Sequence, residues 1–342
     1  MHMTSSVIDP CFPLVDLHHH LDGSVRLETI LDLGLQYNLP LPARTLEGLR
    51  PFVQVSENQP GVMAFIEKFE WMTRILVDEQ ACWRVAYENV EDAARDGLDY
   101  VEMRYSPWFM AEANTLDPVA VIDAVTDGLH EGERDFGVKV NQIGILSRHY
   151  GREIAQLELA MILSRRDAFT GLDLAGDEAN YPGELFVEHF KTARNAGLHI
   201  TVHAGEAAGP RSIWQALEEL GAERIGHAVH APEDANLIAH LREKRIGLEL
   251  NLTSNVQTST VPSYIAHPAR YFMEEGLLAG LNTDDPGISA IDLHYEFEVA
   301  GPLAGLSPEQ LRQMQINALE MAFLTDAEKK ALMDTAKQRE KR

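Results

Sequence analysis

Cysteine is scarce in this chain, and so are basic residues and long apolar segments. The two cysteines, Cys11 and Cys82, are too few for a disulfide framework or for a zinc site built from cysteine ligands. No run of about 18 apolar residues is present, and the N-terminus lacks the basic and apolar regions of an export signal. We therefore expect a cytoplasmic protein that does not span a membrane.

The chain carries 29 basic and 53 acidic residues, which give a formal net charge of −24. Nucleic acids and anionic lipids bind clustered lysine and arginine, so this balance excludes both as expected partners. A neutral or cationic small molecule is a better match to an acidic chain. Hydrophobic residues make up 45% of the sequence, which is typical of a protein with a substantial core.

What the sequence does contain is a regular alternation of short apolar runs and longer amphipathic segments. Several runs are apolar at consecutive positions, which is typical of parallel strands buried on both faces. Ser307 with Gln310, and Thr325 with Glu328, have the spacing of capping boxes and predict two helix starts. The predicted strands cover residues 14–18, 99–105, 139–146, 171–175, 199–203, 224–227, 247–251 and 278–283.

Eight strands alternating with helices predict an α/β fold, a (β/α)8 TIM-like barrel formed by residues 1–342 as a single domain. The rival fold is a doubly wound open sheet, but no Gly-x-Gly-x-x-Gly motif follows the first predicted strand. Residues 25–97 are largely helical and longer than one crossover needs, so we expect extra helices that cap the C-terminal mouth of the barrel. Residues 1–11 and 338–342 are expected to be flexible.

Unusual polar residues follow several of the predicted strands. His18 and His20 end the first strand, and alternate residues of a strand point the same way, so both imidazoles can reach one ion. Imidazole is a ligand that suits Zn²⁺. An isolated His-x-His pair is more often a chance cluster than a metal site, so its meaning depends on the other strand ends.

In a (β/α)8 barrel the carboxyl ends of all strands meet at one mouth, where residues distant in the sequence come together. His203 ends the fifth predicted strand, and Glu206 follows it across the Gly205 turn. Each residue also has an ordinary interpretation. His203 could be a packed histidine, and Glu206 could be a carboxylate that caps a helix. The pair His18 and His20 favours a catalytic role for both.

Asp284 and Asp285 follow the eighth predicted strand, which Pro286 ends. Adjacent carboxylates repel each other unless a cation or a proton donor separates their roles. A metal on one carboxylate and a substrate donor on the other would do so, whereas an Asp-Asp-Pro turn explains the loop alone. His227 ends the sixth strand, and its spacing leaves a packed and a functional histidine equally open.

Five motifs, in order along the chain, resemble the signatures of the adenosine deaminase family. The resemblance extends from about residue 14 to residue 323. The matching segments are His18-His19-His20-Leu21-Asp22-Gly23, Leu172-Asp173-Leu174-Ala175-Gly176-Asp177-Glu178, Thr201-Val202-His203-Ala204-Gly205-Glu206, Ile225-Gly226-His227 and Asn282-Thr283-Asp284-Asp285-Pro286. Two positions depart from the family pattern: Ala228 stands where glycine is usual, and Asn251 stands where cysteine is frequent.

The resemblance implies that each chain holds one Zn²⁺ ion on three histidines and one aspartate. These ligands are His18, His20, His203 and Asp284. The ion would lower the pKa of a water toward about 7, so that hydroxide attacks C6 of a purine. His227 would orient or deprotonate that water, and protonated Glu206 would donate to N1.

The resemblance also implies how the substrate is held. Asp285 would accept a hydrogen bond in the purine N7 region, the Gly176 backbone would meet N3, and Asp22 would reach the ribose 5′-hydroxyl. The implied enzyme is an aminohydrolase that converts adenosine, and 2′-deoxyadenosine, to inosine plus ammonia in purine salvage.

Three alternatives stand beside this interpretation. Relatives that act on free adenine tend to carry Glu at the position of Asp22, so Asp22 favours a nucleoside, and modified purine nucleosides stay open. A catalytically silent nucleoside-binding protein is less favoured, because Glu206, His227 and all four implied ligands are present. Cytidine-type zinc deaminases are excluded, since their motif needs paired cysteines.

Overall fold

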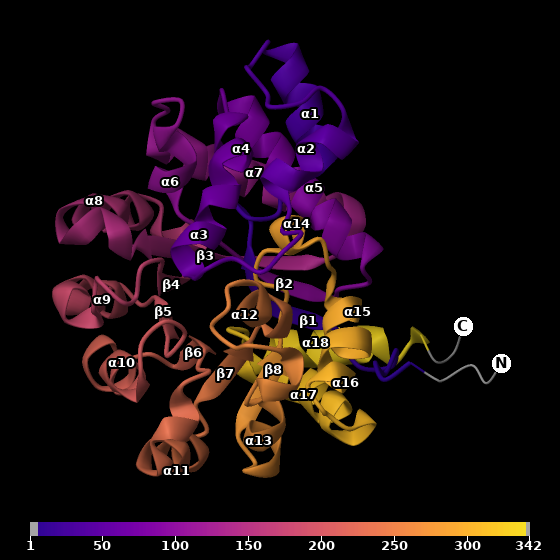
Figure 1. Cartoon of the computed structure of the whole chain (residues 1–342), viewed down its shortest axis with the longest axis vertical. Helices are drawn as coiled ribbons and strands as arrows, with labels where there is room; N and C mark the ends of the chain where they lie inside the picture. The colour runs from indigo at the N-terminus through magenta and orange to yellow at the C-terminus, as the bar shows by residue number, and fades with distance from the viewer. Residues whose placement is uncertain (1–5, 340–342) are drawn as a thin grey trace.

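The computed structural model describes residues 6–339, and its eight β-strands all pair in parallel. Each strand pairs with its neighbour in the chain, so the order in the sheet is β1 to β8 (Figure 1). The strands are β1 (Val15–His20), β2 (Tyr100–Tyr105), β3 (Lys139–Ser147), β4 (Phe169–Ala175), β5 (His199–Ala204), β6 (Arg224–His227), β7 (Gly247–Leu250) and β8 (Leu278–Leu281).

The sheet closes between its first strand and the segment that follows its last. Asp284 donates its backbone N–H to the His18 carbonyl at 2.8 Å, and His20 donates to the Asp284 carbonyl at 2.7 Å. His19 and Asp284 form a parallel bridge at the same place. The eight strands therefore form a (β/α)8 barrel, which confirms the fold predicted from the alternation of apolar and amphipathic segments.

Five strand ends differ from the predicted ones, and those of β3 and β5 lie one residue later, at Ser147 and Ala204. β1 continues to His20, because its last residues pair with β2 and with the segment after β8. β7 ends at Leu250, and Asn251 is the residue immediately before helix α12 (Leu252–Gln257). β8 ends at Leu281, and the backbone of Asp284 then turns with a φ of +61°.

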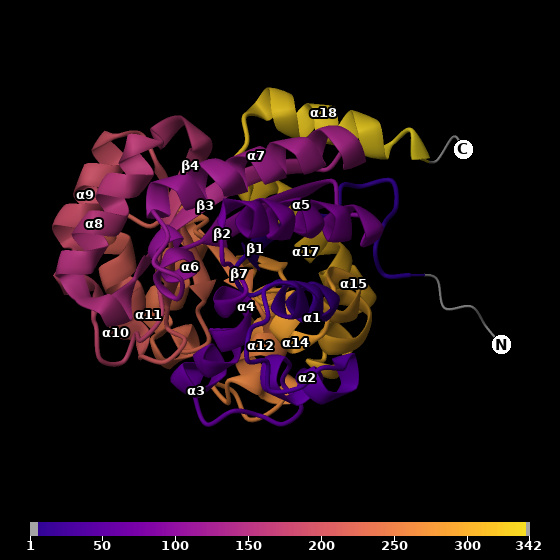
Figure 2. The same ribbon diagram turned by 90° about the horizontal axis from the view of Figure 1, so that it is seen from above.

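Helices connect successive strands on the outside of the barrel (Figures 1 and 2). Between β1 and β2 lie α1 (Leu27–Gln36), α2 (Leu46–Val53), α3 (Val62–Ile66), the 3₁₀ helix η1 (Glu67–Phe69), α4 (Glu70–Arg74) and α5 (Glu79–Arg95). The later crossovers contain α6 (Pro107–Glu112), α7 (Pro118–Phe136), α8 (Gly151–Ser164), α9 (Val187–Asn195), α10 (Pro210–Gln215), α11 (Ala235–Lys244), α12 and α13 (Ala269–Glu274). After β8 come α14 (Pro286–Ser289), α15 (Leu293–Tyr295), α16 (Gly301–Leu303), α17 (Pro308–Met321) and α18 (Asp326–Ala336).

The first crossover supplies the predicted cap over the C-terminal mouth. Phe65 of α3 and Phe69 of η1 line the pocket at that mouth, whereas α5 packs beside α7 on the outside of the barrel. Figure 2 shows α3 and α12 on the opposite side of the barrel from α18. One end of the barrel is therefore covered by short helices from the first crossover, and α18 crosses the other end.

Both predicted capping boxes are present. Ser307 and Gln310 exchange hydrogen bonds at the start of α17, and Thr325 and Glu328 do so at the start of α18. Such exchanges satisfy backbone N–H groups that have no partner within the helix. The local sequence therefore determines where these two helices begin.

The predicted flexible ends fall partly outside the described residues, which exclude 1–5 and 340–342. Within the described part, the backbone N–H of Asp9 donates to Gln315 at 2.9 Å. Among residues 6–339, no helix is both long and apolar enough to cross a membrane. The organisation of residues 1–342 as one domain stays a prediction.

The interior of the barrel holds a network of buried charges as well as apolar side chains. Glu249 of β7 accepts hydrogen bonds from Arg104 at 2.9 Å and from Arg224 at 2.6 Å. Arg224 also pairs with Glu102, and its guanidinium lies 3.6 Å from the centre of the Phe323 ring. All four charged side chains are buried, so each depends on its partners for stability.

We expect Arg224→Met to lower the free energy of unfolding by about 3–5 kcal/mol, because it removes this partner from the buried carboxylates of Glu102 and Glu249. The matched control is Arg211→Met, since Arg211 is exposed and its ion pair with Glu184 contributes at most about 1 kcal/mol. Denaturant unfolding of both variants measures the two changes. Equally small changes in both would show that the buried network does not stabilise the barrel.

Candidate active site

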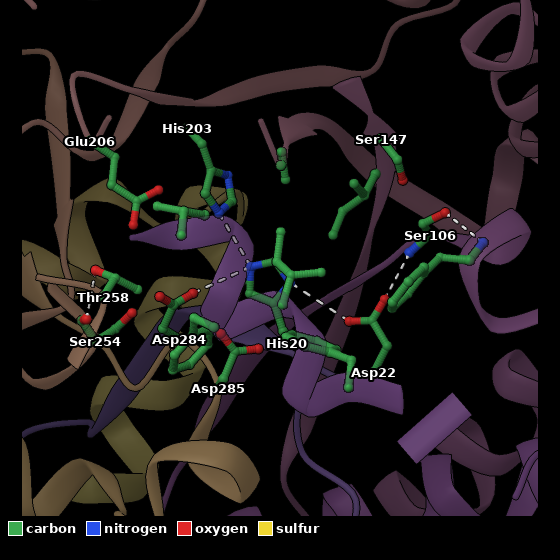
Figure 3. Close-up of a pocket in the computed structure, with 18 of the residues that line it drawn as sticks. His20, Asp22, Ser106, Ser147, His203, Glu206, Ser254, Thr258, Asp284 and Asp285 are labelled. Carbon is green, nitrogen blue, oxygen red and sulfur yellow. Dashed lines mark hydrogen bonds and ion pairs between the residues drawn. The ribbon is translucent and has the colours of Figure 1, made fainter. Parts of the chain in front are cut away.

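A pocket opens at the carboxyl ends of the strands, where the barrel fold leads one to expect it. The space at this mouth, part of which is open to solvent, amounts to about 650 Å³. Every predicted site residue except His18 lines this pocket, and His18 touches two of those residues from beneath. The lining residues among them are His20, Asp22, Gly176, His203, Glu206, His227, Asp284 and Asp285. Figure 3 shows His20, His203, Glu206 and Asp284 pointing toward one another.

The four predicted metal ligands lie together, with one ligand atom of each within 4.8 Å of all the others. His18 Nε2 is 3.0 Å from His203 Nε2 and 3.1 Å from Asp284 Oδ1. His20 Nε2 is 3.3 Å from both His203 Nε2 and Asp284 Oδ1. Ligands bonded at about 2.0–2.1 Å to one ion would lie about 3–4 Å apart, so this spacing fits a metal site.

The hydrogen bonds of two histidines also favour a cation at this place. His18 donates from Nδ1 to Glu249 at 2.7 Å. His203 donates from Nδ1 to Asp173 at 2.9 Å, and burial lowers the pKa of His203 to about 3, although Asp173 acts in the opposite direction. These Nδ1 contacts leave the Nε2 atoms of both rings available to a cation, and the two Nε2 atoms lie 3.0 Å apart.

The two adjacent aspartates have opposite protonation preferences. Burial raises the pKa of Asp284, but the neighbouring histidines, His18 foremost, lower it to well below its ordinary value. Burial and then the charge of Asp284 raise the pKa of Asp285 well above its ordinary value. Their surroundings thus favour the charged form of Asp284 and the neutral form of Asp285.

Glu206 lies on a loop that a second carboxylate holds in place. Glu178 accepts hydrogen bonds from the backbone N–H groups of four consecutive residues, 205–208, at 2.7–3.0 Å. Burial, followed by the charges of Asp284 and Glu178, raises the pKa of Glu206 well above its ordinary value. These surroundings therefore favour the protonated form of the Glu206 carboxyl.

Asp22 and Asp285 each present to the pocket an oxygen, Oδ1, that has no hydrogen-bond partner within residues 6–339. The other oxygen of Asp22 accepts from the Ser106 N–H at 3.2 Å. Gly23 allows Asp285 to approach this closely, because a Cβ at position 23 would lie 1.8 Å from Asp285 Oδ1. Buried polar atoms without a protein partner are typical of a site that a ligand completes.

The backbone is strained at three residues of the site. His227, Ala228 and Asp284 have φ values of +67°, +55° and +61°, in the left-handed region that few non-glycine residues adopt. The Ala228 position, where the family pattern has glycine, therefore does require a positive φ. Strain of this kind is found mainly at functional sites. Gly226 makes room for a metal ligand, since a Cβ there would lie 2.8 Å from His18 Cε1.

The residues that hold these functional groups in place are not among the predicted site residues. Glu249 and Asp173 orient two of the predicted metal ligands, and Glu178 anchors the loop of Glu206. One signal was available, because Glu249 and Arg104 are charged residues inside otherwise apolar strands. Such residues are almost never fully buried unless they are paired.

Comparisons with known proteins place this chain in a family. The family model for adenosine deaminase matches residues 13–339. The chain belongs to the adenosine deaminase family. An adenosine deaminase from Shigella boydii serotype 18 is 56% identical over 328 residues, which cover 96% of this chain and 98% of that protein. The chain is accordingly a hydrolytic aminohydrolase.

Solved structures of several deaminases and amidohydrolases share the fold. An adenine deaminase from Arthrobacter aurescens has a TM-score of 0.89 and 25% identity, covering 97% of this chain and all of that one. An amidohydrolase from Burkholderia ambifaria, solved with bound Zn, has a TM-score of 0.86 and 25% identity, covering 98% and 97%. The Arabidopsis protein ADAL, complexed with GMP, has a TM-score of 0.82 and 26% identity, covering 96% and 98%. The chain thus contains a buried cluster that could hold a metal ion, and it belongs to a metal-dependent family.

We expect Glu249→Gln to weaken metal binding by about 10–100-fold, because the amide is a poorer partner for the Nδ1–H of His18. Metal content after dialysis against a graded chelator series measures the change. Glu158→Gln is the matched control, since Glu158 is equally buried but accepts hydrogen bonds from Ser106 and Ser147. If both variants retain metal equally well, Glu249 does not support the site.

Proposed function

We propose that this chain deaminates adenosine and 2′-deoxyadenosine hydrolytically in purine salvage, releasing ammonia and leaving the 6-oxo nucleoside, which is inosine when adenosine is the substrate. The observation that carries this proposal is a buried carboxyl with a raised pKa, Glu206, beside a cluster of four metal ligands. An acid and a nucleophile site next to each other are what hydrolysis at a purine C6 requires.

Zinc is the proposed ion, since three imidazoles and one carboxylate suit it and a structural neighbour holds it. Its proposed ligands are His18, His20, His203 and Asp284. When bound, zinc lowers the pKa of a water toward about 7 and so supplies a nucleophile near neutral pH. Glu206 donates its proton to purine N1, which lets the ring accept electrons as C6 is attacked. His227 faces the attacking oxygen.

The purine is proposed to lie between these polar groups and an apolar wall that includes Phe65 and Phe69. Asp285 donates a hydrogen bond to N7, in place of the acceptance expected from the family resemblance, because its pKa is raised and N7 is an acceptor. Gly176, with a φ of +101°, brings its backbone to N3. Asp22 Oδ1, which lies 3.6 Å from His20 Nδ1 and has no hydrogen-bond partner within residues 6–339, accepts from the ribose 5′-hydroxyl.

Glu206→Gln is expected to keep its metal and to lose turnover by at least about 100-fold, because the amide cannot give a proton to N1. Steady-state rates with adenosine, together with metal analysis, measure both properties. The matched control is Glu296→Gln, since Glu296 is a buried carboxyl with a pKa raised by burial to about 8, and it caps α12 outside the pocket. Full activity of Glu206→Gln would remove Glu206 from the role of acid.

The metal-replete protein is expected to deaminate adenosine with a higher kcat/KM than adenine. Asp22→Asn should lower kcat/KM for adenosine by about 10–100-fold, the value of a hydrogen bond to a charged group, and should leave the rate with adenine unchanged. Deamination rates for both substrates and both proteins measure these effects. A preference for adenine in the parent protein would move the proposed activity to the free base and overturn the role of Asp22.

A further inference from the structure

Behind His227 lies a chain of buried hydrogen bonds that the reaction scheme above does not use. Asn255, on α12, has its Nδ2 2.9 Å from His227 Nδ1. Asn255 Oδ1 is 3.2 Å from His267 Nε2, and His267 Nδ1 accepts from the backbone N–H of Ala269 at 3.1 Å. The side chains of all three residues are buried, so bulk water does not compete for these bonds.

The direction of each hydrogen bond in this series is determined at its far end, by the backbone N–H of Ala269. A backbone N–H can only donate, so His267 Nδ1 must present its lone pair to Ala269. Burial lowers the pKa of His267 to about 3, so this ring is neutral and its single proton is on Nε2. That proton is donated to Asn255 Oδ1.

The amide of Asn255 is then oriented in one way. Its oxygen faces His267, so its NH₂ group faces His227 and donates to Nδ1. Because Nδ1 is the acceptor, the proton of the neutral His227 ring is on Nε2. This nitrogen lies 3.8 Å from Asp284 Oδ2, on the side of the metal cluster.

Two other polar groups lie near the His227 ring and do not determine its tautomer. Asn251 Nδ2 is 3.4 Å from both ring nitrogens, so it is directed at neither lone pair. Glu206 Oε1 is 3.7 Å from Nδ1, beyond hydrogen-bond distance. Among the described residues, Asn255 is therefore the side chain that reaches a His227 nitrogen at an ordinary hydrogen-bond length.

We propose that Asn255 and His267 are positioning residues that hold His227 in its Nε2–H tautomer. This proposal rests on the deaminase function proposed above. It decides whether His227 orients the attacking water or deprotonates it, the two roles that the family resemblance implies. In this tautomer His227 donates a hydrogen bond to the attacking oxygen and offers it no lone pair, so it does not remove the proton of the water. The water gives one proton to the amine, whose bond to C6 breaks as ammonia leaves, and its other proton replaces the one that Glu206 gave to N1.

The decisive substitution is Asn255→Asp, which keeps the shape of the side chain and replaces the NH₂ donor with an acceptor. A carboxylate accepts from both neighbours, so the His227 proton moves to Nδ1 and Nε2 loses its donor. We expect kcat to fall by about 100-fold or more, with KM for adenosine changed by less than about threefold, because binding does not involve the tautomer. Unchanged kcat, or a loss confined to KM, would overturn the proposal.

His267 provides a second test that does not place a charge in the core. His267→Gln keeps an N–H donor for Asn255 Oδ1 and is expected to retain kcat within about threefold. His267→Leu removes that donor, lets the Asn255 amide turn, and is expected to lower kcat by about tenfold or more. Equal kcat values in these two variants would show that His267 acts only through packing.

The tautomer itself is measured by nitrogen-15 NMR of the zinc-loaded protein with labelled histidine, since the shifts identify which ring nitrogen carries the proton. We expect Nε2–H for His227 in the parent protein and Nδ1–H in Asn255→Asp. Asn251→Cys is the matched control and should keep Nε2–H and an unchanged kcat, because Asn251 aims at neither ring nitrogen. An Nδ1–H ring in the parent protein would overturn the proposal. A parent protein with the expected tautomer but no adenosine turnover would instead overturn the proposed function.

Discussion

The buried carboxylate of Glu249 is the group on which both the barrel interior and the active site depend. Its Oε2 accepts from His18 at 2.7 Å and from Arg104 at 2.9 Å. Its Oε1 accepts from Arg224 at 2.6 Å and from Thr201 at 2.8 Å. A carboxylate has about four lone-pair sites, so all of them are used. One side chain therefore joins the charges deep in the barrel to a metal ligand at its mouth.

A network of this kind holds its members rigidly, because a buried charge without its partner is strongly unfavourable. The proposed metal ligands are thus held in place by protein groups alone, which is the preorganisation that electrostatic catalysis requires. The cover of the pocket is built differently. Phe69 packs edge-to-face against both Phe65 and Phe109, and all three rings are on helices of only a few residues. The floor of the site depends on paired charges, and its roof depends on apolar packing.

The same contrast divides the acidic groups of the site into two sets. Asp173, Glu249 and Asp284 are buried, yet neighbouring cations and imidazoles lower their pKa values well below the ordinary ones. Glu206 and Asp285 are equally buried but lie beside other carboxylates, which raise their pKa values well above the ordinary ones. The same type of side chain is thus favoured as a charged carboxylate in one place and as a protonated carboxyl in another.

Much of this protein was determined by its sequence alone. Eight apolar runs separated by amphipathic segments predict the barrel, because parallel strands buried on both faces leave that pattern. The grouping of His18, His203 and Asp284 could be predicted because strand ends converge at one mouth. Only the tertiary structure decided the direction of the buried hydrogen bonds. Examples are the bond from His18 to Glu249 and the bond from Asn255 to His227. Protonation and hydrogen-bond direction depend on burial and on neighbours brought together from distant segments, and no pattern along the chain encodes those distances.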